Sequence, residues 1–176
     1  MAYFRRSLYK DIYENKYTFA YKSNDELVSW APDFYKNPSK GFNCVDFALF
    51  IARLAIKANK VVTLAKVGCV QKEQDKVKRC YHIIPMELEI NGWNIVNYVG
   101  DDPTSRIFNY KSGDIAETLD FFVEDFIPSL IVHNNLDPKL SEVEVYYTDP
   151  ETLLVTLIEY YNTEISQRDL LNILFS

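Results

Sequence analysis

Residues 44–58 form the most apolar segment of the chain, and their pattern limits what the chain can fold into. Apolar side chains recur there at three- and four-residue steps, as Val45, Ala48 and Ala52 illustrate, and further aliphatic and aromatic residues widen the stripe. A helix that is apolar on most sides packs inside a protein. The sequence therefore predicts a buried central helix that starts at Cys44, just after a loop at residues 36–41.

Three strands are predicted to follow this helix, over residues 61–70, 81–90 and 93–99. The last two flank Asn91-Gly92, a strong hairpin signal because both residues readily adopt positive φ. Pro85 lies in the first arm of the hairpin and has no N–H to donate. We therefore expect an edge strand or a bulge at that position.

The rest of the chain is predicted to be mainly helical. Residues 115–130 are amphipathic as far as Pro128. Asp149-Pro150 supplies an N-cap and a first-turn proline for another helix, and Ser166 begins a sequence that resembles a capping box. A short helix is also expected over residues 24–30.

A central helix, then strands, then helices indicates an α+β fold. We expect a single domain over residues 1–176, with a helical C-terminal extension over residues 112–176.

Charge and hydropathy argue against two classes of partner. The chain carries 25 acidic and 19 basic residues, a net charge of −6, and no basic stripe that would favour nucleic-acid binding. The densest cationic stretch, residues 72–79, is interrupted by Glu73 and Asp75 and is predicted to be a solvated loop. No apolar run reaches the roughly 18 residues of a membrane span. With no signal-peptide pattern at the start, a cytoplasmic protein is expected.

The three cysteines are an odd number without CxxC spacing, which predicts neither a disulfide framework nor a zinc site. No metal and no cofactor are expected, and the chain has no glycine-rich phosphate loop. The thiols are expected to stay free in a reducing compartment.

Cys44 is the strongest candidate for chemistry, because the first turn of a helix offers unpaired N–H groups and a positive dipole end that favour thiolate. The same amides can receive the oxyanion of a tetrahedral intermediate. His82, on a predicted strand, can serve as the base. Asn97 or Asp101, on the next strand, can orient the imidazole.

Other residues are given structural roles, with functional alternatives left open. His133 is interpreted as a surface or helix-terminus histidine. Cys80 lies on the same strand face as His82 and is either a packed cysteine, a redox partner or an alternative nucleophile. Cys69 is assigned to the core. Trp30 either packs in the core or covers the site.

Residues 41–50 (GFNCVDFALF) resemble the motif that opens the central helix in the transglutaminase-like branch of the papain-like cysteine proteins, with one extra residue before the cysteine. His82, Trp93 and Asn97 reproduce the spacings of the family's histidine, tryptophan and third triad member. The resemblance covers roughly residues 24–104. It implies a papain/transglutaminase-like fold whose helix packs on a small antiparallel sheet.

The sequence departs from the family pattern at Ile84, where a tryptophan often stands, and at Asn97, where an aspartate is usual. The third triad member has two candidates. The spacing favours Asn97, whereas an ideal hairpin with Asn91-Gly92 as its loop places Asp101 opposite His82.

The resemblance implies a cysteine-dependent acyl-transfer enzyme that acts on an amide bond of a peptide or protein. Cys44 would form a thioester, with His82 as base and then acid. Hydrolysis, by a cysteine protease, amidase or deamidase, is favoured over transglutaminase cross-linking, because water needs no second binding site. The alternative is a non-catalytic scaffold in which acidic C-terminal helices bind a protein partner. A third hypothesis is an acyltransferase with a small thioester donor.

Overall fold

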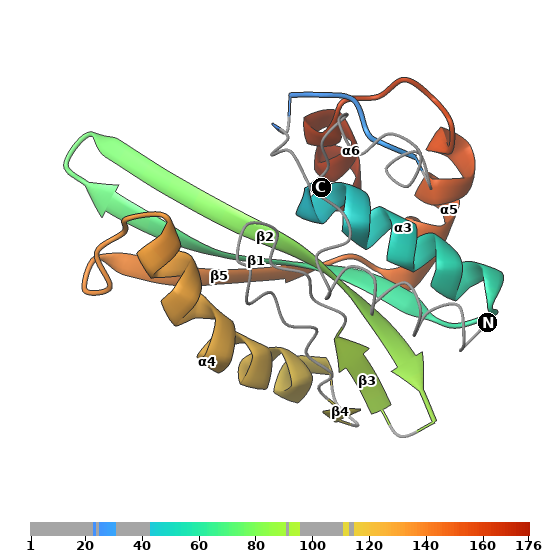
Figure 1. Cartoon of the computed structure of the whole chain (residues 1–176), viewed down its shortest axis with the longest axis horizontal. Helices are drawn as coiled ribbons and strands as arrows, with labels where there is room; N and C mark the ends of the chain where they lie inside the picture. The colour runs from blue at the N-terminus through green and yellow to red at the C-terminus, as the bar shows by residue number, and fades with distance from the viewer. Residues whose placement is uncertain (1–22, 24, 31–42, 91, 96–110, 113–114) are drawn as a thin grey trace, which may run out of the picture.

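The structure is a computed structural model that describes residues 23, 25–30, 43–90, 92–95, 111–112 and 115–176 (Figure 1). These residues form a mixed α/β fold around a five-stranded antiparallel sheet in the order β4-β3-β2-β1-β5. The elements are α3 (Cys44–Lys57), β1 (Val62–Glu73), β2 (Lys76–Glu89), β3 (Gly92–Ile95), β4 (Lys111–Ser112), α4 (Ile115–His133), β5 (Ser141–Tyr147), α5 (Pro150–Tyr160) and α6 (Gln167–Leu174).

The predicted central helix is confirmed as α3, which begins at Cys44. Its N-cap is Asn43, whose side-chain oxygen accepts the N–H groups of Val45 (3.0 Å) and Asp46 (3.3 Å). The Asp46 carboxylate accepts the Asn43 N–H in return (3.3 Å), which completes a capping box. Two of the orphan donors at the start of α3 are thereby satisfied within the chain.

The sheet separates two hydrophobic clusters, because successive side chains along a strand point to opposite faces. Leu64 and Ile83 belong to the cluster formed with α3, α5 and α6, which we call the α3 face. Ala65 and Ile84 belong to the cluster formed with α4, which we call the α4 face. Figure 1 shows α3, α5 and α6 on one side of the long strands and α4 on the other.

The ladder between β1 and β2 is unbroken from Val62↔Glu87 to Glu73↔Lys76, so the bulge predicted at Pro85 is wrong. The N–H of Leu88 donates to Val61 O (2.9 Å), which makes the even-numbered residues of β2 the ones that hydrogen-bond to β1. Pro85 is odd-numbered, so its ring nitrogen points away from β1. A proline at that position removes no hydrogen bond from this ladder.

The hairpin between β2 and β3 turns one position earlier than predicted. Leu88 pairs with Trp93 and Glu89 with Gly92, so Ile90 and Asn91 lie between the last pair. The prediction that Asn91-Gly92 forms the two-residue loop is therefore wrong, because Gly92 already pairs with Glu89. Gly92 adopts positive φ (116°), as the sequence favours, but it does so as the first residue of β3.

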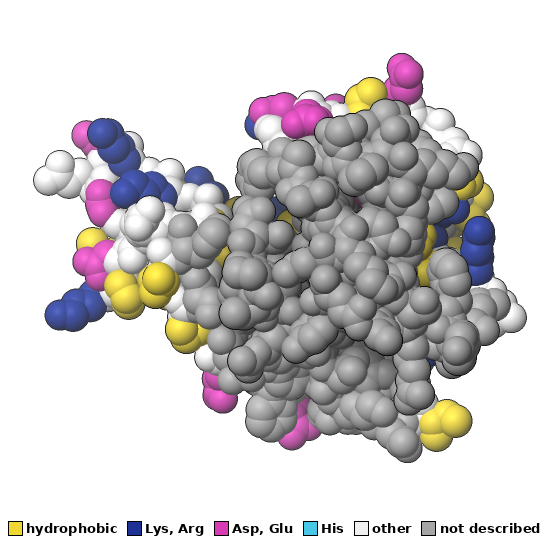
Figure 2. Space-filling view, viewed as in Figure 1, with side chains coloured by type: hydrophobic (Ala, Val, Ile, Leu, Met, Phe, Trp, Pro, Cys, Tyr) yellow, Lys and Arg dark blue, Asp and Glu magenta, His cyan; other side chains and the backbone are white. Residues whose placement is uncertain are grey.

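The predicted loop at residues 72–79 is also corrected. Its residues form the ends of β1 and β2, joined through Gln74 at φ 46°. Figure 2 shows side chains of both charge signs at this projecting end of the hairpin. A solvated two-stranded ribbon carries charges on both faces, which gives it the composition of a loop.

The helix predicted at residues 24–30 is absent from the part of that segment that the structure describes. Leu27 instead forms an isolated antiparallel bridge with Ser166. The N–H of Val28 donates to Ile165 O (2.9 Å), and the N–H of Gln167 donates to Glu26 O (3.0 Å). These backbone bonds hold the segment against the start of α6, far away in the sequence.

The C-terminal third contains more than the predicted helices. The helices after Asp149 and Ser166 are confirmed as α5 and α6, and each of these residues caps its helix. However, β5 pairs with β1, so this region completes the sheet and is more than a helical extension. The helix α4 also continues past Pro128 to His133, where the sequence predicted an end.

Candidate active site at the start of α3

The Cys44 thiol lies where α3 meets the sheet. Its side chain is half-buried and packs beside the α3-face cluster. The backbone N–H of Ile83 in β2 faces the sulfur, together with the N–H groups of Cys44 and Val45. The sulfur is therefore surrounded by backbone donors from two different elements.

Burial is the largest influence on the Cys44 pKa and raises it above 9.0. The nearby Asp46 carboxylate raises the pKa further, whereas the three backbone N–H groups lower it by a smaller amount. We expected the start of the helix to favour thiolate, but the net direction is the opposite. At neutral pH the thiol keeps its proton, so a nucleophile at this position needs a base.

His82 lies in β2 next to the residue whose amide faces Cys44, and it is 8% exposed. It pairs with Val67, and its side chain shares the strand face of Ile84 and Met86. Alternation therefore directs the imidazole toward the α4 face, whereas Cys44 packs on the α3 face.

The backbone of β2 next to His82 reaches Cys44 at the edge of this strand. The N–H of Ile83 points away from β1, because only the even-numbered residues of β2 hydrogen-bond to that strand. The described β3 pairs end at Met86↔Ile95, so Ile83 lies beyond them along β2. One peptide unit separates the amide that faces Cys44 from the Cα of His82. To form a Cys–His pair, the His82 imidazole would have to reach the Cys44 sulfur past this edge of β2.

The remaining predicted site residues are placed in different ways. Asn97 and Asp101 lie outside the described residues. Trp30 packs against the α3-face cluster, its indole N–H donates to Thr163 O (2.9 Å), and its ring meets Tyr161 edge-on at 5.8 Å. These contacts match the structural interpretation of Trp30.

Residues from distant parts of the chain hold the first turn of α3. The N–H of Ser29 donates to the buried Asp46 carboxylate (2.8 Å). Asn43 Nδ2 donates to Gln167 Oε1 (2.7 Å), and Gln167 is fully buried. Sequence reasoning missed Gln167, because its contact with Asn43 spans 124 residues and leaves no local pattern.

The other cysteines lie on the α4 face. Cys69 in β1 and Cys80 in β2 are direct partners in the ladder, and both contribute to the α4-face cluster. Cys69 is buried, as predicted, and Cys80 is half-buried. His133 is the last residue of α4, which agrees with a helix-terminus position.

Within the described residues, no group of three or more His, Cys, Asp or Glu side chains is arranged to hold a metal ion. None of the helices among those residues has the length and apolarity needed to span a bilayer. No family model, curated protein or solved structure matches the chain.

Proposed function

We propose that the chain is a cysteine-dependent acyl-transfer enzyme with a transglutaminase-like arrangement, acting on an amide bond of a peptide or protein. One observation supports this most directly. The Cys44 thiol sits at the start of a buried helix and against the amide that follows His82. A nucleophile and a set of backbone donors are two of the components that acyl transfer needs, and His82, adjacent to Ile83 in β2, is the proposed base.

The raised pKa of Cys44 assigns a specific role to His82. The imidazole removes the thiol proton as the sulfur attacks the carbonyl carbon, and it then gives that proton to the leaving amine. The Cys44 N–H stabilises the oxyanion. Water then hydrolyses the thioester, which gives a peptidase, amidase or deamidase. Asn97 is proposed to orient the imidazole, with Asp101 as the alternative.

A mixed library of synthetic peptides tests this proposal, because it offers both backbone and glutamine side-chain amides. Mass spectrometry of the products and measurement of released ammonia distinguish peptide-bond cleavage from deamidation. Cys44→Ala should abolish turnover and change the free energy of unfolding by at most about 1–2 kcal/mol. The matched control is Cys80→Ala, which removes another half-buried thiol and should leave turnover intact. Equal turnover in wild type and Cys44→Ala would rule the proposal out.

A second candidate function, a protein-interaction subunit, is favoured by the outer surface of α5. Leu154, Val155 and Ile158 are 37%, 54% and 72% exposed on this short helix. Exposed apolar side chains grouped on one helix are typical of contact surfaces. In α4, Glu117, Asp120 and Glu124 are also exposed, as the predicted acidic docking surface requires.

Complementation in the source organism separates the two candidates. The variants are Cys44→Ala, Ile158→Glu, and a charge-reversal set at Glu117, Asp120 and Glu124. Loss of function from Cys44→Ala alone supports the enzyme. Full function from Cys44→Ala, with loss from either surface variant, supports the interaction subunit.

A further inference from the structure

Cys69 and Cys80 occupy directly opposed positions in the β1–β2 ladder. The Leu88 N–H donates to Val61 O, and hydrogen-bonded pairs recur at every second position of an antiparallel ladder. Counted in steps of two from Val61 and Leu88, Cys69 and Cys80 also form a hydrogen-bonded pair. The Cα atoms of such a pair are about 5.5 Å apart. That separation lies within the range of about 4.4–6.8 Å that a disulfide bond spans.

The two side chains also point to the same face. Both lie on the α4 face, and the Cys80 Sγ is 3.9 Å from the carbonyl oxygen of Cys69. The ladder holds the two backbones in register, so a local adjustment at these two positions is what remains to bring the sulfur atoms together.

The two thiols differ in access. Cys69 is fully buried, whereas Cys80 is half-buried and can meet a small reagent. This difference suits a two-step exchange, in which an accessible thiol reacts first and its neighbour resolves the intermediate.

From this geometry we propose that Cys69 and Cys80 form a reversible thiol–disulfide site whose oxidant is a low-molecular-weight disulfide. The Cys80 thiol loses its proton and attacks one sulfur of the oxidant, which forms a mixed disulfide and releases one small thiol. The Cys69 thiolate then attacks the Cys80 sulfur and releases the second small thiol. The protein loses two electrons and two protons, and the oxidant is reduced to two thiols. The site is independent of Cys44 and of the proposed acyl transfer.

The site is expected to react slowly at neutral pH. Burial and the neighbouring Cys80 raise the pKa of Cys69 to about 11, and burial raises the pKa of Cys80 as well. Thiolates are the attacking species in exchange, so a raised pKa lowers the reactive fraction. Cys69 and Cys80 are expected to join because they are opposed in the ladder, and not because either thiol is unusually reactive.

The test uses the reduced full-length chain and oxidised glutathione as the probe. We expect the free-thiol count to fall from three to one and the protein mass to fall by two hydrogen atoms. Trypsin can cleave after Lys72, Lys76 and Arg79, which lie between the two cysteines. The non-reduced digest should therefore contain a linked pair of peptides, which dithiothreitol separates.

Three variants make the outcome decisive. Cys44→Ala should form the same linked peptides as the wild type. Cys69→Ser should stop at a mixed disulfide on Cys80, and Cys80→Ser should retain both of its remaining thiols. Three results would overturn the proposal: a link that includes Cys44, a mixed disulfide on Cys80 that persists in the wild type, or three free thiols after an incubation that oxidises a control dithiol peptide.

Discussion

The two faces of the sheet are covered in different ways. On the α3 face, a complete capping box fixes the start of α3, and buried polar groups of Asp46 and Gln167 tie that start to other segments. On the α4 face, the cluster contains Ile84 and Met86, the buried Gln71 accepts the Asp137 N–H (2.7 Å), and the covering helix contains Pro128. On the α3 face, the directed polar contacts converge on the first turn of one helix.

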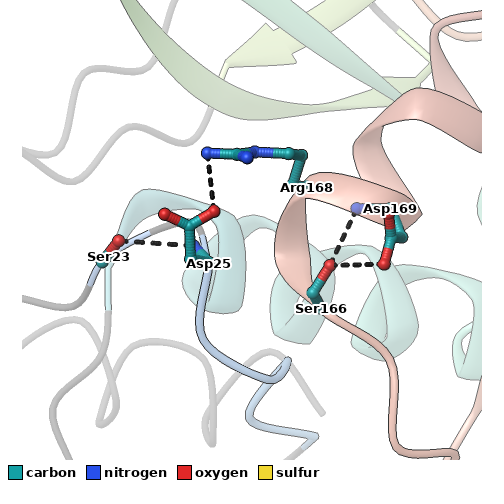
Figure 3. A network of polar contacts seen from close by, with 5 residues as sticks. All are labelled: Ser23, Asp25, Ser166, Arg168 and Asp169. Atoms are coloured by element: carbon teal, nitrogen blue, oxygen red, sulfur yellow. Dashed lines mark hydrogen bonds and ion pairs between the residues drawn. The ribbon is translucent and has the colours of Figure 1, made fainter.

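The difference shows where the chain can hold a reactive group in a fixed position. Figure 3 shows the polar contacts at the start of α6, where Asp25 meets Arg168 at 2.6 Å and Ser166 caps α6 by accepting the Asp169 N–H (3.1 Å). The next residue after Ser166, Gln167, accepts the hydrogen bond from Asn43 at the start of α3. Segments from both ends of the chain converge there. Packing and hydrogen bonds together lock the rotamers of a site, which favours the start of α3 as the place for a nucleophile.

The largest effect on stability is expected from truncating two adjacent residues whose side chains pack on opposite faces of the sheet. Ile83→Ala opens a cavity in the α3-face cluster, and Ile84→Ala opens one in the α4-face cluster. Each should lower the free energy of unfolding by about 2–5 kcal/mol, measured by urea denaturation. Only Ile83→Ala should alter the rate at which iodoacetamide labels Cys44, because that side chain packs on the face where Cys44 lies. Equal effects of both variants on Cys44 labelling would contradict the division into two faces.

Gln167→Ala should give a smaller loss of about 1–2 kcal/mol, because it removes the buried acceptor of the Asn43 amide. The control is Gln71→Ala, which removes another buried glutamine, whose side-chain oxygen accepts the Asp137 N–H (2.7 Å). Both variants should unfold at lower urea concentrations. Turnover, or Cys44 labelling, should change for Gln167→Ala alone. The prediction fails if the Gln71 variant changes Cys44 labelling equally.

Local patterns in the sequence were sufficient to predict the elements around Cys44. The apolar periodicity of residues 44–58 predicted α3, and the capping residues Asp149 and Ser166 predicted α5 and α6. Each of these signals depends on neighbours within one or two helical turns. These helix signals therefore do not depend on contacts with distant parts of the chain.

The missed features depend on contacts that are distant in the sequence. The strand β5 has an alternating pattern, Ser-Glu-Val-Glu-Val-Tyr-Tyr, but much of it is exposed and its strand character comes from pairing with β1. The extension of α4 beyond Pro128 is tolerated where that proline is exposed. The raised pKa of Cys44 requires the position of Asp46 and the depth of burial, which a helix-start argument does not contain.

Alkaline pH should destabilise the fold by an amount of the order of 1 kcal/mol. Burial raises the pKa of Cys69 to about 11 and that of Tyr81 to about 12, so the unfolded chain releases these protons at lower pH than the folded chain. The stabilisation is complete below pH 9 and declines as the pH rises toward 11. Urea midpoints between pH 7.5 and 10.5 measure the decline. Cys69→Ala should make it shallower, and an unchanged slope would show that this thiol is not its source.

The smallest effect is expected from Arg168→Ala, although its ion pair with Asp25 at 2.6 Å is the shortest polar contact in Figure 3. Both side chains are 64% exposed, so water competes for each charge and the pair should contribute less than about 1 kcal/mol. Added salt should reduce even that contribution in the wild type. A double-mutant cycle with Asp25→Ala isolates the coupling energy from other effects of each change. A coupling of 2 kcal/mol or more would mean that the segment at residues 25–30 is held mainly by this surface pair. The backbone bonds of Glu26 and Val28 to the start of α6 would then be secondary, and the contrast between directed buried contacts and solvated ones would no longer hold at this site.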